Sequence, residues 1–241
     1  MIGYNVAKAN ELMKNLAEAY NRCGNTIADG WPAVSQTMQQ YWIGEDEQSY
    51  EDTFCKRMCK MYTSACQIVR DLNTNLKNLG TGWHDFQQKN VLEGATSPAV
   101  FAANFEEVTI TENDEIIKYR PASVTEASDR GVKDGALNAI QSAMSEYLTN
   151  VKTSLQDIYA GIDASTAFLG SQQSVKINEY IEQIGGALGS VVTAANDIYT
   201  ALEKLTQTSY AQSEEQVSTE YGSSNIQADI EGQLGDMKWN G

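Results

Sequence analysis

Few residues of this chain have the types and spacing that chemistry requires. The 241 residues include one histidine, His84, so counting excludes a histidine-centred catalytic triad and a multi-histidine metal site. The 32 acidic residues are spread along the chain and show none of the pairing that is typical of acid–base catalysis. We therefore expect a protein that is not an enzyme and that has no metal site and no cofactor.

The four cysteines all lie in the first third of the chain and lack the CxxC spacing of a zinc ribbon or a thioredoxin-like motif. Two interpretations stay open. Cys23, Cys55, Cys59 and Cys66 are small hydrophobic residues in a buried seam, or Cys23 forms a bridge with Cys59 or Cys66. A helical hairpin that turns near residue 42 places position 23 opposite about position 61, which allows the bridge.

Charge and hydropathy exclude several classes of partner. Lys and Arg number 17 against 32 acidic residues, a net charge of -15, which argues against nucleic acids and anionic membrane surfaces. The first residues, MIGYNVAKANELMK, lack the basic and apolar regions of a signal peptide. The longest weakly polar run, residues 184–195, is too short and too rich in glycine to span a membrane.

Helical periodicity organises most of the chain, and the same pattern occurs twice. The first seam steps by three or four through Met13, Leu16, Tyr20, Cys23, Ile27, Trp31, Val34 and Met38. The second runs through Phe54, Met58, Met61, Ala65, Ile68, Leu72, Leu76 and Leu79, beside a stripe of Cys55, Cys59, Tyr62, Cys66 and Val69. Adding 124 to the first seam gives Leu137, Ile140, Met144, Tyr147, Val151, Leu155, Ile158 and Ile162. Adding 126 to the second gives Tyr180, Ile184, Ala187, Val191, Ala194, Ile198, Leu202 and Leu205.

The seams predict an all-α fold, in which two long antiparallel helical hairpins form a single-chain four-helix bundle. The helices are expected near residues 4–40, 45–80, 129–164 and 171–215, with a kink but no break at Gly30-Trp31-Pro32. Two hairpin domains follow, residues 1–90 and 127–217.

The remaining segments have a different composition. In the linker, residues 91–126, the β-rich runs 107–111 and 115–119 flank a turn-forming cluster, which predicts a small β-hairpin. Residues 218–241 are acidic and contain glycine and serine, so we expect a flexible tail.

The predicted turn of the first hairpin contains Trp42-Ile43-Gly44, followed by three acidic residues. Glycine suits a tight helix–helix turn, the acids favour the positive end of the next helix, and the Trp ring can cover the end of the seam while its N–H stays near water. The second hairpin has Phe168-Leu169-Gly170 in the same place, a degenerate copy in which an aromatic ring replaces Trp and Gly is kept.

A helical hairpin of this length, with Trp-x-Gly in its turn and no signal peptide, resembles the WxG family of small type VII secretion proteins. Members of that family pair as two hairpins, and this chain looks like such a pair fused in tandem. The family also implies an export signal, Tyr-x-x-x-Asp/Glu, after the second helix of one partner. Tyr210 and Glu214 fit that place. The same pattern occurs at Tyr41–Glu45, Tyr159–Asp163 and Tyr199–Glu203, and only location favours Tyr210.

The resemblance implies a non-enzymatic substrate or adaptor, made in the cytoplasm and secreted without a cleaved signal peptide to the cell surface or the medium. Its implied partners are a membrane-bound secretion ATPase and another secreted WxG protein or toxin. Two alternatives stay open: a targeting or chaperone module for a co-secreted toxin, and a structural bundle unrelated to secretion.

We expect the export signal to be a composite surface. If the two hairpins pack antiparallel, the turn with an exposed Trp42 and Gly44 lies beside Tyr210 and Glu214 at the end of the last helix. Phe168 then lies at the opposite end, near His84 and Gln88, and that end should take no part in export.

Overall fold

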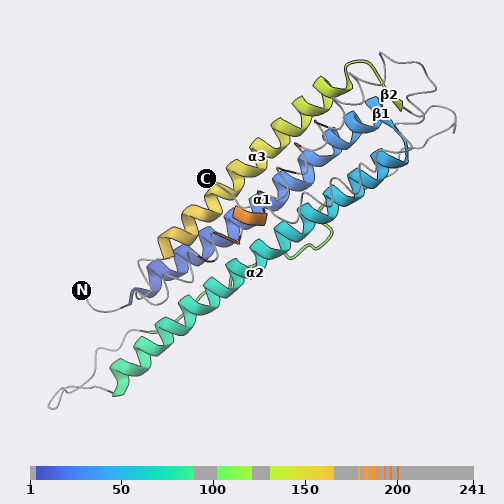
Figure 1. Cartoon of the computed structure of the whole chain (residues 1–241). Helices are drawn as coiled ribbons and strands as arrows, with labels where there is room; N and C mark the ends of the chain where they lie inside the picture. The colour runs from blue at the N-terminus through green and yellow to red at the C-terminus, as the bar shows by residue number, and fades with distance from the viewer. Residues whose placement is uncertain are drawn as a thin grey trace.

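The computed structural model describes residues 4–89, 102–120 and 131–165, together with scattered helical residues between 179 and 200. Three long helices dominate it: α1 (Val6–Tyr41), α2 (Glu45–Lys89) and α3 (Ala136–Ala164). Two short strands, β1 (Trp42–Ile43) and β2 (Gly131–Val132), form an antiparallel pair at one end. Figure 1 shows the helices side by side, with α1 between the other two. The prediction of a mainly helical protein is confirmed.

Helix α1 begins at a capped end and continues through its proline. The side chain of Asn5 accepts a hydrogen bond from the backbone N–H of Lys8 (3.0 Å), which satisfies one of the free donors of the first turn. Pro32 lies inside the helix, which runs on to Tyr41 as one element, as the unbroken seam predicted. The helix ends where Trp42 adopts an extended conformation.

Helices α1 and α2 form the predicted antiparallel hairpin. Tyr20 stacks on Tyr62 at 4.4 Å between ring centroids, and Trp31 stacks on Phe54 at 5.0 Å. These pairs place position 23 opposite about position 61, as the predicted turn requires. All the predicted seam residues of both helices are buried except Leu79, which is half-buried.

Helix α2 is longer than predicted, because it continues past residue 80 to Lys89. The helix continues through Gly80, where the lack of a side chain leaves room for two aromatic rings. A Cβ atom there would lie 2.3 Å from the ring of Phe105 and 2.7 Å from that of Tyr4. The glycine therefore serves packing and not helix termination.

Helix α3 runs antiparallel to α1. The hydroxyl of Tyr147 donates to the carbonyl of Ile27 (3.2 Å), and Arg22 forms an exposed ion pair with Asp157 (3.5 Å). The predicted start near residue 129 is wrong, because residues 131–132 pair with β1 and the helix begins after Gly135. That glycine has a φ of +80°, a left-handed conformation that other residues adopt at a cost. The predicted seam of α3 is buried, apart from the half-buried Leu137.

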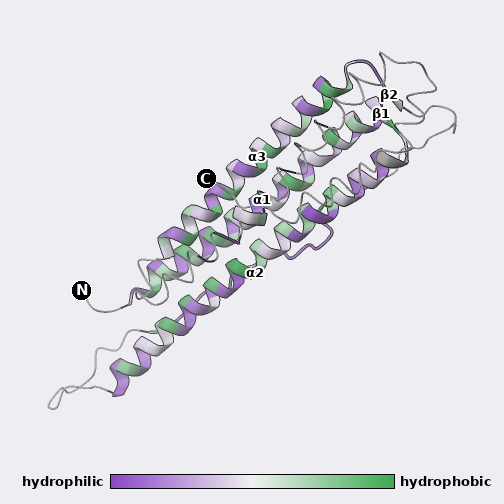
Figure 2. Cartoon of the chain, viewed as in Figure 1, coloured by the Kyte–Doolittle hydropathy of each residue, from purple (hydrophilic) through white to green (hydrophobic). Residues whose placement is uncertain are grey.

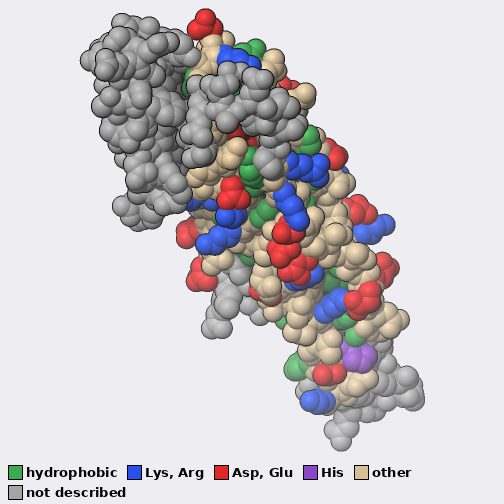
Figure 3. Space-filling model, turned by 90° about the vertical axis from the view of Figure 1, so that its right-hand side faces the viewer, with side chains coloured by type: hydrophobic (Ala, Val, Ile, Leu, Met, Phe, Trp, Pro, Cys, Tyr) green, Lys and Arg blue, Asp and Glu red, His purple; other side chains and the backbone are tan. Residues whose placement is uncertain are grey.

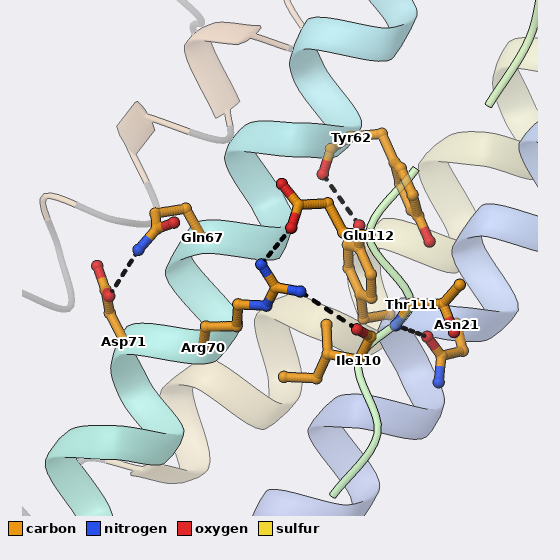
Figure 4. A network of polar contacts seen from close by, with 9 residues as sticks. Asn21, Tyr62, Gln67, Arg70, Asp71, Ile110, Thr111 and Glu112 are labelled. Carbon is orange, nitrogen blue, oxygen red and sulfur yellow. Dashed lines mark hydrogen bonds and ion pairs between the residues drawn. The ribbon is translucent and has the colours of Figure 1, made fainter. Parts of the chain in front are cut away.

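The predicted β-hairpin in the linker is wrong. Residues 102–120, here called the strap, contain no strand. The strap is extended up to a turn at residues 114–115 and lies against α1 and α2, as Figure 4 shows for its central part. Its apolar side chains pack on the helical core, with Ile117 buried and Phe105, Val108 and Ile110 partly buried. The apolar side chains that suggested a hairpin thus pack on helices.

All four cysteines are buried and free, so the interpretation as small packing residues is confirmed and no bridge forms among them. The thiol of Cys59 donates to the strap carbonyl of Ile117 at 3.3 Å. Burial raises the pKa of Cys23 to about 11, which keeps this thiol protonated at neutral pH.

Among the residues that the structure describes, Phe86 is the large hydrophobic residue that is exposed. Figure 2 shows hydrophobic and hydrophilic residues interspersed along each helix. Figure 3 shows that acidic and basic side chains alternate over one face, with apolar side chains in small separate groups. Within the described ranges, no helix is both long enough and apolar enough to cross a membrane.

Gly24 is a test of the close contact between α1 and α2. A Cβ atom at Gly24 would lie 2.2 Å from the hydroxyl oxygen of Tyr62, so Gly24→Ala should lower the free energy of unfolding by about 1–3 kcal/mol. Gly82 is the matched control, since it lies in α2 with nothing within 4 Å of a Cβ atom. Gly82→Ala should raise the free energy of unfolding by about 0.5–1 kcal/mol. Denaturant unfolding measures both, and equal effects would contradict the packing.

Candidate functional site

Trp42 lies at the turn between α1 and α2, but it is not on the surface. Only 1% of the residue is exposed. Its backbone N–H donates to the carbonyl of Met38 and closes α1, and it pairs with Val132 in the small sheet. Its ring lies 6.0 Å from that of Tyr50, tilted by 38°. The expectation of an exposed Trp anchor is therefore wrong, because pairing with the distant strand β2 covers this end of the seam.

Gly44 directly precedes α2. Its carbonyl accepts a hydrogen bond from the N–H of Gln48 (3.3 Å), which has the four-residue spacing of the main-chain bonds in an α-helix. The chain needs only Trp42, Ile43 and Gly44 to pass from α1 to α2. The Trp-x-Gly step is therefore a tight turn that fixes the end of the helical hairpin.

Two carboxylates of the first turns of α2 point inward. Glu51 has no exposed surface and Glu47 is 4% exposed. One carboxylate oxygen of Glu51 accepts from the side-chain amide of Gln39 on α1 (3.1 Å), while the other has no hydrogen-bond partner. A buried carboxylate is costly unless a partner compensates its charge.

The end of the strap covers these carboxylates. The amide of Gln39 also donates to the strap carbonyl of Arg120 (2.6 Å). Tyr119 is half-buried beside them, and its burial, followed by the charges of Glu47, Glu51 and Asp52, raises its pKa to about 12. The site at the turn thus combines residues from α1, α2, the small sheet and the strap.

Residues next to Trp42 in the chain, and Lys133 beside them, form the accessible surface at this turn. Tyr41 and Ile43 are half-buried, while Gln40 and Lys133 are exposed. The N–H of Lys133 donates to the carbonyl of Tyr41 (2.8 Å), which holds the two segments together. An approaching partner would meet Tyr41 and Ile43 and not the Trp ring.

Sequence reasoning missed the buried carboxylates, although the pattern contained a signal. The second apolar stripe of α2 includes Cys55, and two steps of four residues back from it lead to Glu51 and Glu47. This extrapolation places both carboxylates on the buried face of α2. The roles of Val132 and Tyr119 had no comparable local signal, because each depends on the path of the linker.

The remaining predicted site residues, Phe168, Gly170, Tyr210 and Glu214, lie outside the described residues. The structure does place the start of α3 beside the turn of the first hairpin through the β1–β2 pair. His84 lies near the other end of α2, where its ring Nε2 is 2.9 Å from the side-chain nitrogen of Gln88.

Comparison with protein-family models, with curated proteins and with solved structures finds no match for this chain. Among the described residues, no group of three or more His, Cys, Asp or Glu side chains is arranged to hold a metal ion. The turn thus presents the half-buried side chains of Tyr41 and Ile43, above the buried carboxylates of Glu47 and Glu51.

Trp42→Ala should lower the free energy of unfolding by about 3–5 kcal/mol, because it leaves a cavity beside Tyr50. Trp83 is the control, since it is half-buried near the end of α2 and contacts Phe86 edge-on. Trp83→Ala should cost about 1 kcal/mol or less. Thermal unfolding followed by circular dichroism compares the two, and a small effect at Trp42 would contradict its structural role.

Glu51→Gln should raise the free energy of unfolding by about 1–3 kcal/mol at neutral pH, because it removes a buried charge and keeps an oxygen that can accept from Gln39. The neighbouring Asp52 is half-buried and pairs with the exposed Lys56 (2.6 Å), so Asp52→Asn should change stability by about 0.5 kcal/mol or less. A loss of stability in Glu51→Gln would show instead that a cationic group compensates this carboxylate.

Proposed function

We propose that this chain is a non-enzymatic substrate or adaptor of a type VII, WxG-type secretion system. The observation that carries the proposal is the Trp-x-Gly step itself. Trp42 and Gly44 form the tight turn between two long antiparallel helices, and Trp42 seals the end of their shared core. Burial of the ring supports a role in fixing the shape of the helix end that an export partner would contact.

We also propose that residues 171–215 form a fourth helix that completes a single-chain bundle. The residues described between 179 and 200 are all helical. Ala187, a residue of the expected seam, packs against the core, and Gly185 beside it is buried. Thr193 is also buried, although it lies outside the expected seam. Asn196 and Thr200, which the seam leaves outside, are exposed.

The mechanism would be recognition without chemistry. A fourth helix that runs back along α3 would end near the start of α3, and therefore beside the turn of the first hairpin. Tyr210 and Glu214 would then lie near Tyr41 and Ile43. The apolar side chains would supply most of the binding energy, and Glu214 would add specificity through its charge.

The partner in this proposal is a membrane-bound secretion ATPase, and the protein would be exported without a cleaved signal peptide. A carrier role for a toxin or a second secreted WxG protein is the alternative. It differs in one outcome: the co-secreted protein should fail to appear in the medium when this chain is deleted.

The decisive experiment compares two acidic residues that share the Tyr-x-x-x-Asp/Glu pattern. Glu214→Ala should reduce the amount of protein in the medium at least tenfold, because a charge specific to the export surface is lost. Asp163→Ala changes the exposed acidic residue of the Tyr159–Asp163 pattern on α3 and should be exported normally. Immunoblots of medium and cells, with and without the ATPase, measure both.

Export of Glu214→Ala at the level of the unaltered chain would contradict the composite signal. Release of the unaltered chain from cells without the ATPase would contradict the secretion proposal as a whole.

A further inference from the structure

The strap is held by two asparagines of α1 that make the same pair of hydrogen bonds. The side chain of Asn10 donates to the carbonyl of Asn104 (3.0 Å) and accepts from the N–H of Glu106 (3.1 Å). The side chain of Asn21 donates to the carbonyl of Thr109 (3.1 Å) and accepts from the N–H of Thr111 (3.1 Å). Each amide thus binds a carbonyl and the N–H two residues later, as a neighbouring parallel strand would.

The spacing of the two amides matches the spacing of an extended chain. Asn10 and Asn21 are 11 residues apart, or about 16 Å at about 1.5 Å per helical residue. The two bonded sites on the strap are five residues apart, also about 16 Å at about 3.3 Å per extended residue. A helix with asparagines at this interval can therefore form hydrogen bonds with the backbone of an extended segment that runs parallel to it.

The opposite edge of the strap is bound by basic residues of α2. Arg70 pairs with Glu112 and donates to the carbonyl of Ile110 (3.5 Å), and Figure 4 shows its guanidinium reaching the strap opposite Asn21. Lys77 pairs with Glu107 at 2.9 Å. Between the two edges, Phe105, Val108 and Ile110 pack toward the helical core.

We propose that the groove between α1 and α2 is a binding site for an extended acidic strand, and that a second copy of this chain can supply that strand in place of the chain's own. In this site Asn10 and Asn21 would form hydrogen bonds with the backbone of the strand. Arg70 and Lys77 would pair with its acidic side chains, and the groove would bind its apolar side chains.

The second copy is the occupant that the observations favour. Its strap has the apolar and acidic residues at the intervals that the groove contacts, and its Glu107 and Glu112 complement Lys77 and Arg70. The strap has no strand partner within the described chain. Its contacts are with side chains of α1 and α2, and exchange between copies replaces each contact by its equal. Exchange therefore depends on concentration and not on new interactions.

Two complementary variants of the full chain test this. A strap-blocked variant carries Phe105→Ser, Val108→Ser and Ile110→Ser, and keeps an intact groove. A groove-blocked variant carries Asn10→Leu, Asn21→Leu and Arg70→Ser, and keeps an intact strap. Leucine favours the helix but can neither donate nor accept a hydrogen bond. The control is a third chain with both sets of substitutions.

Each variant alone should sediment as a monomer at about 100 µM, and the mixture of the two should form a 1:1 heterodimer. The strap-blocked variant mixed with the control should associate at least tenfold more weakly. Monomers in the first mixture, or equal association in both, would overturn the proposal.

A second measurement covers the case in which a variant loses its helical circular dichroism. A fluorescent peptide of residues 102–113 should bind the chain with the single change Ile110→Ser, and should bind the chain with Asn10→Leu and Asn21→Leu added at least tenfold more weakly. Equal binding to the two chains, or binding to neither, would overturn the assignment of the groove.

Discussion

The structure depends on the burial of one helix by two others. Trp31 of α1 stacks on Phe54 of α2 at 5.0 Å and meets Tyr147 of α3 at 5.7 Å, so all three helices share one aromatic contact. Because α1 has apolar side chains on both flanks of its seam, neither neighbour alone can cover it. Aromatic rings bury large areas in fixed geometries, and this contact sets the register of both helix pairs.

This arrangement leaves polar groups in the core that the surroundings do not satisfy. The indole nitrogen of Trp31 and the side-chain amide of Asn73 are buried and have no hydrogen-bond partner, and the same is true of one oxygen of Glu51. Each such group costs about 1–3 kcal/mol. The long helical seams bury enough apolar surface to tolerate these costs. The unsatisfied polar groups nevertheless make the fold less stable than the apolar seams alone would make it.

The strap shows how a segment with strand-like residues can be stabilised by helices. Its backbone groups bond to side-chain amides of Asn10 and Asn21, and its apolar side chains pack into a groove between helices. A hairpin would have required the runs 107–111 and 115–119 to pair with each other. The strap instead bonds to the side-chain amides of α1 and packs in the groove between the helices.

The sequence by itself determined the helical seams, the antiparallel register of α1 and α2, and the burial of the cysteines. These follow from the 3.6-residue period and from a short turn, which are local properties. Tertiary structure alone decided that Trp42 is buried, that Glu51 lies beneath the end of the strap, and that residues 102–120 are not a hairpin. Each of these depends on a partner far along the chain. Val132 pairs with Trp42, and the carbonyl of Arg120 accepts from the same Gln39 amide that binds Glu51. A periodic pattern gives the face that a residue occupies, but it does not give which distant segment comes to cover that face.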